Sequence, residues 1–321
     1  MRRRPSGRCA IPPARRSSKT ISTEDRGGPG APGQQSQPPQ PARQPQLPPR
    51  LAAALDLLTR TAAAPGGGTG TGPFAGLEAP RRLIDVGCDH ARLALAALEG
   101  GLVCCAVASD LRPGPLAAAR REARRRQIAV GEGGPLELRL ADGLQDFDLG
   151  PGDAIAILGL GGREILNILE AADWPREGAW RVVVQPMQQA ATLRLGLWRL
   201  GFRRILERVV LSGGRDYQLW LLEGRAPRLE PAPGDSQAGQ DETPGLFEAI
   251  IGPWGREGSS RDPDQDPKAL IHYLKRQRRL WTARLGQELC TDESGLVLDR
   301  AAIRALLAEL EAVLSEWEAR I

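Results

Sequence analysis

The nine residues Arg82–His90 constrain the fold of this chain more than any other stretch. The stretch begins with apolar residues of high β propensity, which are followed by Asp85 and Gly87. The Ala- and Leu-rich segment 91–98 comes next. This order predicts a buried strand that leads through a tight turn into a helix. Open α/β sheets bind ligands at the carboxyl ends of their strands, and the N-terminus of the helix that follows presents unpaired N–H groups there. The stretch therefore predicts an α/β protein with a ligand site at the turn. A purely conformational role for Asp and Gly is the alternative.

The remaining strands are expected to alternate with helices. Apolar runs predict strands at 103–109, 136–140, 153–158 and 181–184, and a final pair at 205–211 and 217–222. The Ser-Gly-Gly-Arg segment between the last two is typical of a hairpin. Five strands in alternation with helices, followed by a hairpin, indicate a mostly parallel, Rossmann-like α/β sheet with one antiparallel strand. This layout resembles that of a class I methyltransferase.

Three acids follow successive strands of the predicted sheet. Asp85, Asp110 and Asp142 would line one rim, and they suit in turn the ammonium group, the ribose hydroxyls and the adenine amino group of S-adenosylmethionine. A dinucleotide site would instead require a Gly-x-Gly-x-x-Gly turn facing the pyrophosphate. The turn of this chain carries two carboxylates, which would repel a pyrophosphate. The candidate cofactor-binding residues are Asp85, Gly87, Asp110, Asp142, Gly143 and Gly159.

Six short motifs resemble, in this order, those of the bacterial tRNA (adenine-22-N1)-methyltransferases, the TrmK family. The motifs are Asp85–Leu93, Ser109–Pro115, Asp142–Leu144, Gly159–Gly162, Gln185-Pro186 and Asp216-Tyr217, and the resemblance covers residues 47–321. It implies methyl transfer from S-adenosylmethionine to N1 of adenine 22 in tRNA. Two positions depart from the family pattern: Leu160 replaces a common Met, and Met187 replaces a common Asn whose amide could hydrogen-bond the base.

The residues after the fourth predicted strand favour a ring nitrogen as methyl acceptor. Methyltransferases of exocyclic amines usually carry a polar residue, two prolines and an aromatic there, whereas this chain has Gly159–Gly162. Adenine N1 already has an in-plane lone pair, so it needs alignment more than proton removal. Asp89 is placed to stabilise the cationic product or to accept an N6 proton, with capping of a helix from His90 as an alternative role. The candidate catalytic residues are Asp89, His90, Gly161 and Gln185.

Two basic segments are candidate contacts for the tRNA backbone. The first is a predicted helix at 114–127. The second is the first of two helices at 267–289 and 298–317, whose apolar spacing of three and four predicts an antiparallel coiled-coil hairpin around the turn 291–295. A solvated charged face is the alternative to phosphate contact for this helix. The candidate RNA-binding residues are Arg121, Arg124, Arg125, Lys275, Arg276, Arg278 and Arg279.

Composition sets the domain organisation. Residues 1–50 hold eleven of the 27 prolines and ten basic residues against two acids, although the whole chain carries only +4. Such a segment cannot bury enough apolar surface to fold. We therefore expect a disordered tail over 1–49, a cofactor-binding domain over 50–225, and a linker with a helical domain over 226–321.

Composition also limits the function classes. No stretch approaches the about 20 apolar residues of a membrane span, and five scattered cysteines with two histidines form no metal-ligand spacing. The sequence thus predicts a cytoplasmic enzyme without a metal site, with a monomer favoured. Two alternatives are the same fold acting on a small molecule or another RNA position, and a catalytically inactive RNA-binding protein. The basic segments favour RNA over a small molecule.

Overall fold

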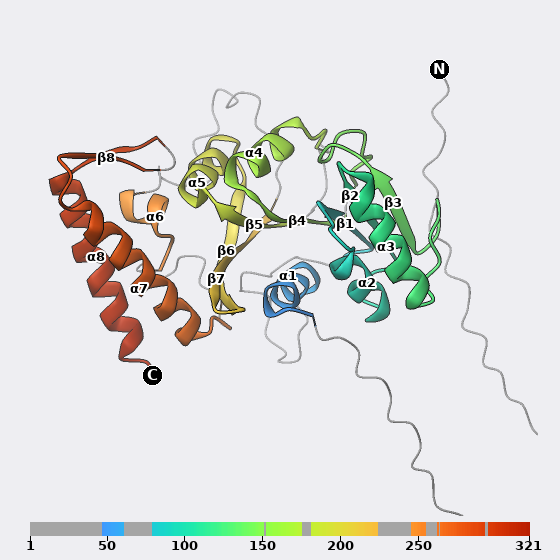
Figure 1. Cartoon of the computed structure of the whole chain (residues 1–321), viewed down its shortest axis with the longest axis horizontal. Coiled ribbons are helices and arrows are strands. Elements are labelled where there is room, and N and C mark those ends of the chain that lie inside the picture. The colour runs from blue at the N-terminus through green and yellow to red at the C-terminus, as the bar shows by residue number, and fades with distance from the viewer. Residues whose placement is uncertain are drawn as a thin grey trace, which may run out of the picture. The chain divides into compact units, whose positions relative to one another are not determined.

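A computed structural model of the chain describes residues 47–60, 79–150, 152–174, 181–223, 245–254, 262, 264–292 and 295–321 (Figure 1). Leu47–Ile321 form one compact unit. The expected tail lies outside the described residues except for its last three positions, and so does the expected domain boundary at 225–226. Within the described ranges, no helix is long and apolar enough to cross a membrane.

A seven-stranded sheet forms the centre of the unit. Its strands are β1 Arg82–Val86, β2 Cys105–Asp110, β3 Leu136–Leu140, β4 Asp153–Gly161, β5 Arg181–Gln188, β6 Arg203–Ser212 and β7 Arg215–Glu223. Their order is β3-β2-β1-β4-β5-β7-β6. The first five strands pair in parallel, and β7 runs antiparallel to both β5 and β6. The predicted mostly parallel sheet with one antiparallel strand is therefore confirmed.

Helices cover both faces of the sheet (Figure 1). Helices α1 Pro49–Thr59, α2 Arg92–Glu99 and α3 Pro113–Arg125 lie on one face, and α4 Gly162–Ala171 and α5 Ala190–Arg199 on the other. Successive strand residues point to opposite faces, so Leu83 packs into the core under α1–α3 and Ile84 into the core under α4 and α5. Burial on both faces explains why β1 reads as a continuous apolar run.

The C-terminal part contains α6 Leu246–Ile250, α7 Pro267–Arg284, β8 Leu289–Thr291, β9 Val297–Asp299 and α8 Arg300–Glu318. The two predicted helices are present, but the first ends at Arg284 rather than at residue 289. A turn bond is present within the predicted turn 291–295, where the N–H of Gly295 donates to the Asp292 carbonyl at 3.1 Å. The sequence did not predict the strands on either side, β8 and β9, which pair with Cys290 opposite Leu298. Both of these residues are buried between exposed neighbours, which is strand periodicity. The coiled-coil packing of α7 and α8 stays a prediction.

A buried polar cluster connects this C-terminal part to the sheet. Arg194 of α5 is 3% exposed and donates to Glu207 of β6 and to Oε1 of Gln218 on β7, the latter at 2.6 Å. The same guanidinium donates to the Ile250 carbonyl at 3.0 Å, and Tyr273 of α7 donates to the Ile251 carbonyl at 2.7 Å. Moving one of these partners away would leave a buried charge without compensation, which is energetically costly. The cluster therefore holds α5, β6, β7 and the C-terminal part in fixed positions.

Candidate functional site

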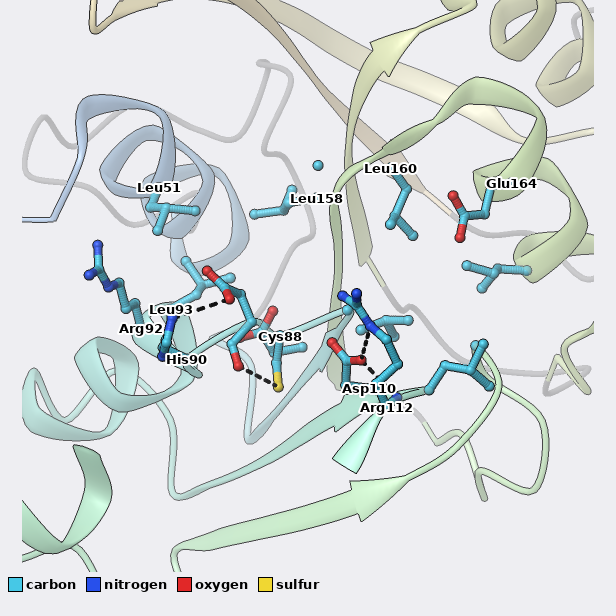
Figure 2. Close-up of a pocket in the computed structure, with 18 of the residues that line it drawn as sticks. Leu51, Cys88, His90, Arg92, Leu93, Asp110, Arg112, Leu158, Leu160 and Glu164 are labelled. Carbon is cyan, nitrogen blue, oxygen red and sulfur yellow. Dashed lines mark hydrogen bonds and ion pairs between the residues drawn. The ribbon is translucent and has the colours of Figure 1, made fainter. Parts of the chain in front are cut away.

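A cavity of about 450 Å³ opens at the carboxyl ends of β1, β2 and β4 (Figure 2). This volume lies in the range of sites for small molecules and cofactors, roughly 300–1,000 Å³. All six candidate cofactor residues line the cavity: Asp85, Gly87, Asp110, Asp142, Gly143 and Gly159. The structure therefore brings together residues that lie far apart in the sequence, from Asp85 to Gly159.

The turn after β1 owes its shape to a series of left-handed residues. Gly87 has φ +67°, a conformation for which a residue without Cβ is preferred. Asp89 and Ala91 follow with φ 50° and 53°, and the N–H of Cys88 donates to the Ser109 carbonyl of β2 at 2.9 Å. Helix α2 begins only at Arg92, with Ala91 at its N-cap and no side-chain cap bond. The alternative that Asp89 caps a helix from His90 is therefore wrong.

Asp85 is a buried carboxylate facing this cavity with an unsatisfied oxygen. Its Oδ2 has no hydrogen-bond partner in the part of the chain that the structure describes. Burial raises the pKa of Asp85 to about 7, the charge of Asp89 adds to this rise, and a hydrogen bond from the backbone of Ala94 opposes it. An unsatisfied buried carboxylate is costly on its own, and a cationic group of a ligand would compensate for that cost.

Asp110 ends β2 on the opposite side of the turn and is also buried. Its Oδ1 accepts a hydrogen bond from the backbone N–H of Arg112 at 2.9 Å, and Nε of Arg112 lies 3.6 Å from the same oxygen (Figure 2). The backbone bond fixes the orientation of a carboxylate that can accept from ligand hydroxyl groups.

Two glycines keep the far side of the cavity open. Gly143 has φ +61°, and a Cβ there would lie 2.9 Å from Cγ1 of Ile168, which also lines the cavity. Gly159 has φ +81° and lies where the β4–β5 register shifts between Leu158 and Leu160. Both positions therefore require glycine for backbone reasons that hold whatever ligand binds.

The four candidate catalytic residues separate into two pairs. Asp89 and His90 line the cavity, with Nε2 of His90 3.4 Å from Oδ1 of Asp89 and both side chains substantially exposed. Gln185 and Gly161 do not line it. Gln185 is buried and donates to the Pro186 carbonyl at 2.9 Å, and Gly161 pairs with Gln188 across the β4–β5 ladder. The structure therefore places Asp89 and His90 at the cavity, whereas Gly161 and Gln185 lie outside its lining.

Sequence reasoning missed the wall that α1 contributes. Pro48, Arg50 and Leu51 line the cavity, as do Arg92, Arg112 and Glu164 (Figure 2). Helix α1 is held in place by Arg181 of β5, whose Nη1 donates to the carbonyls of Leu58 and Arg60 at 2.9 and 2.7 Å. No local signal near residue 50 indicates this docking, because the docking depends on Arg181 of β5, which lies far from α1 in the sequence.

The two basic segments differ in how their charges are paired. Arg121, Arg124 and Arg125 of α3 are exposed, and Arg125 forms an ion pair with Glu122. On α7, Lys275 pairs with Glu318 at 2.7 Å and Arg278 with Glu311 at 3.2 Å. Arg276 pairs with Asp216 at 2.7 Å, while Arg279 is exposed. Acids of α8 and β7 thus neutralise much of the second segment.

Comparisons with known proteins agree with this geometry. A family model described as a methyltransferase domain matches residues 75–220. The tRNA (adenine(22)-N(1))-methyltransferase of Bacillus subtilis (strain 168) is 28% identical over 172 residues, which are 54% of this chain and 67% of that protein. Among the residues with described positions, no group of three or more His, Cys, Asp or Glu could hold a metal ion.

Solved structures share the fold. The B. subtilis m1A22 tRNA methyltransferase TrmK has a TM-score of 0.55 at 20% identity and covers 85% of this chain and 98% of its own. A Streptococcus pneumoniae protein in complex with S-adenosyl-L-methionine has a TM-score of 0.52 at 20% identity and covers 83% of this chain and 98% of its own. The motifs, the matched domain and the curated relative together confirm the resemblance seen in the sequence. The chain therefore has a methyltransferase domain over residues 75–220 and is similar to the TrmK family of class I methyltransferases.

Proposed function

We propose that this protein methylates N1 of adenine 22 in tRNA with S-adenosylmethionine as methyl donor. The observation that carries the proposal is the single cavity lined by Asp85, Asp110 and Asp142, three carboxylates from three separate strand ends. Similarity to the B. subtilis tRNA (adenine(22)-N(1))-methyltransferase supports the choice of substrate. A tRNA substrate makes the cytoplasm the expected compartment, and a monomer is the expected state.

The residues of the cavity suit the proposed cofactor. Asp85 would accept from the ammonium group, Asp110 from the ribose hydroxyls and Asp142 from the adenine amino group. The unsatisfied Oδ2 of Asp85 supports the first assignment. Gly87 and Gly143 would let the backbone approach the cofactor closely. When bound, S-adenosylmethionine supplies an electrophilic methyl group on a cationic sulfur.

Asp89 and His90 are the proposed contacts for the target base. A base inside a folded tRNA must leave its stack to reach a pocket of this kind. The Asp89 carboxylate would stabilise the positive charge that N1 methylation places on the adenine, or would accept the N6 proton afterwards. The imidazole of His90, 3.4 Å from Asp89, would orient that carboxylate. Neither role requires a proton to leave N1 before methyl transfer.

Mapping the product tests the proposal. The full-length protein is incubated with S-adenosylmethionine labelled in its methyl group and with total unmodified tRNA, and the labelled nucleotide is then identified. We expect a single product, 1-methyladenine at position 22, and no label in a tRNA that carries guanine at that position. Label at another nucleotide would establish a different RNA specificity. Cofactor binding without any transfer would establish the inactive RNA-binding alternative.

A further inference from the structure

A second cavity of about 240 Å³ lies beside the first. It is lined by the carboxyl end of β5, by residues of β7 and by residues of α7. The two cavities share no lining residue. They are adjacent across the β4–β5 ladder, because Leu160 of the first cavity pairs with Pro186 of the second. A molecule bound at the methyl-transfer site therefore has this second cavity as its neighbour along the same edge of the sheet.

The lining of the second cavity combines apolar surface, amide groups and charged residues, among them Asp292 and the ion pair of Asp216 with Arg276. Met187 and Leu280 are 51% and 44% exposed although both are large apolar side chains. The amides come from three glutamines, of which Gln218 is buried and has its Oε1 held by Arg194 at 2.6 Å. The other two are Gln188 and Gln277. A planar group with polar edges matches this lining better than an aliphatic or a purely ionic one does.

A guanidinium plane completes the cavity. Arg284 lies over the ring of the buried Trp281, with its Cζ 4.7 Å from the ring centroid, and both residues line the cavity. Arginine planes and aromatic rings are the surfaces on which proteins stack unpaired RNA bases. The arginine also leaves a positive charge at a point where a phosphate attached to such a base could pass.

We propose that the second cavity binds one unstacked base of the tRNA, different from the adenine that is methylated. The proposal rests on the proposed function for its RNA substrate. The volume lies below the roughly 300 Å³ where sites for drug-sized ligands begin, so a single base is the size that fits. The methylated base must lie beside the methyl donor in the first cavity, so the second cavity takes another one. Amide groups can then read the edge of that base.

The charge pairing of α7 agrees with a base site rather than a phosphate track. Lys275, Arg276 and Arg278 each have an acidic partner in the folded chain. A phosphate would have to compete with those partners, whereas a base that stacks and hydrogen-bonds leaves them in place. Met187 at this cavity also replaces the asparagine common in the family, so the departure noted in the sequence falls on the second cavity.

Two double variants test the proposal. Gln277→Ala with Leu280→Ala removes one amide and one exposed apolar wall of the cavity. The matched control is Gln287→Ala with Leu289→Ala, since both residues are exposed, lie in the same C-terminal part and do not line the cavity. Affinity for unmodified tRNA is measured by fluorescence anisotropy at one salt concentration. We expect the cavity variant to bind roughly tenfold more weakly, the scale for losing the contacts of one bound base, and the control to bind like the wild type.

Melting temperature and S-adenosylmethionine affinity of both variants are expected to match the wild type, which separates loss of the base site from loss of folding. If the cavity variant binds tRNA as tightly as the control, the proposal is overturned. If the wild type binds tRNA but transfers no methyl group, the proposed function fails, and the comparison of the two variants still decides the base site. If the wild type does not bind tRNA, both are overturned.

An abasic scan then identifies the bound base. Each nucleotide near adenine 22 is replaced in turn by an abasic residue, and binding to the wild type and to the cavity variant is compared. The occupant is the nucleotide whose removal weakens the wild type but has no further effect on the cavity variant, because the two changes then act on one interaction. Such coupling at position 22 itself would contradict the assignment to a second base.

Discussion

At the scale of single residues, the role proposed for Asp85 would couple protonation of the protein to cofactor binding. Its pKa of about 7 in the folded chain lies above the ordinary value of 3.8, because burial penalises the charged form. The folded protein without ligand therefore binds this proton more tightly than the unfolded chain does. The free energy of unfolding should consequently decline as pH rises from about 4 through 7, the range between the two pKa values. A cationic ligand group beside Asp85 would reverse that penalty.

We expect affinity for S-adenosylmethionine to rise with pH up to about 7 and to level off above it, because in the proposed binding mode only ionised Asp85 would attract the ammonium group. The slope below pH 7 should approach, at most, about tenfold per pH unit. Calorimetry between pH 5.5 and 8.5, in buffers of different ionisation enthalpy, would also detect proton release below pH 7. Asp85→Asn should remove both the slope and the proton release. A wild-type affinity that does not change with pH would contradict the assignment.

Asp89 allows chemistry to be separated from stability. Its φ of 50° is tolerated by Asp and Asn better than by most residues, so Asp89→Asn keeps the turn and removes only the charge. We expect the single-turnover rate to fall by roughly 10²-fold, the lower end of the scale for a positioned acid–base group. The melting temperature should stay unchanged, since the N-cap of α2 is Ala91. A near-normal rate would exclude a catalytic role for this carboxylate.

At the scale of secondary-structure elements, α1 is the part of the site that comes from furthest away. Its residues Arg50 and Leu51, with the N-cap residue Pro48, form one wall of the first cavity. The opposite end of the helix is fixed by Arg181, which is 3% exposed and donates to the carbonyls of Leu58 and of the C-cap residue Arg60. The position of the wall therefore depends on a side chain that does not touch the cavity.

We expect Arg181→Leu to lower the free energy of unfolding by about 2–4 kcal/mol, because two hydrogen bonds to a charged group are lost. Affinity for S-adenosylmethionine should fall as well, since α1 loses its anchor. Urea unfolding and calorimetry on the same preparation measure the two effects. The control is Arg199→Leu, an exposed position on α5 that should change neither. Weakened folding with full cofactor affinity would show that α1 keeps its place without Arg181.

The elements also show what the sequence reveals and why it stops there. The strands and their acidic ends could be predicted, because burial on both faces of the sheet leaves continuous apolar runs and the ligand edge collects polar residues. The docking of α1 and the burial of Gln185 could not, because both depend on residues distant in the chain. The β8–β9 hairpin was missed because its three-residue strands are too short for a periodic signal.

At the scale of the whole molecule, the two basic segments should contribute unequally to tRNA binding. Arg121 and Arg124 of α3 are exposed. Lys275 and Arg278 of α7 would have to leave Glu318 and Glu311 to reach a phosphate. A cation that already has a partner releases fewer counterions from RNA, so its contribution to the salt dependence of binding is smaller.

We expect Arg121→Gln with Arg124→Gln to reduce the slope of log K against log salt by about 1–2, and Lys275→Gln with Arg278→Gln to reduce it by less than about 1. Binding of unmodified tRNA at four or more salt concentrations gives the slopes. Cofactor affinity, measured in parallel, should be the same for both double variants. Equal slopes for the two variants would show that the ion pairs of α7 open at no cost when RNA binds.

The position of α1 has a consequence for synthesis of the protein on the ribosome. Ala54, Leu57 and Leu58 of α1 belong to the same core as Leu206 of β6 and Leu219 and Leu221 of β7. Helix α1 leaves the ribosome before the sheet it packs against, and β7 is translated some 160 residues after it, as 215 − 55 shows. Chains that await such distant contacts fold slowly and expose apolar surface meanwhile. A nascent chain that already contains the turn after β1 therefore still lacks a complete cofactor cavity. The apolar face of α1 stays accessible to chaperones until β7 has been synthesised.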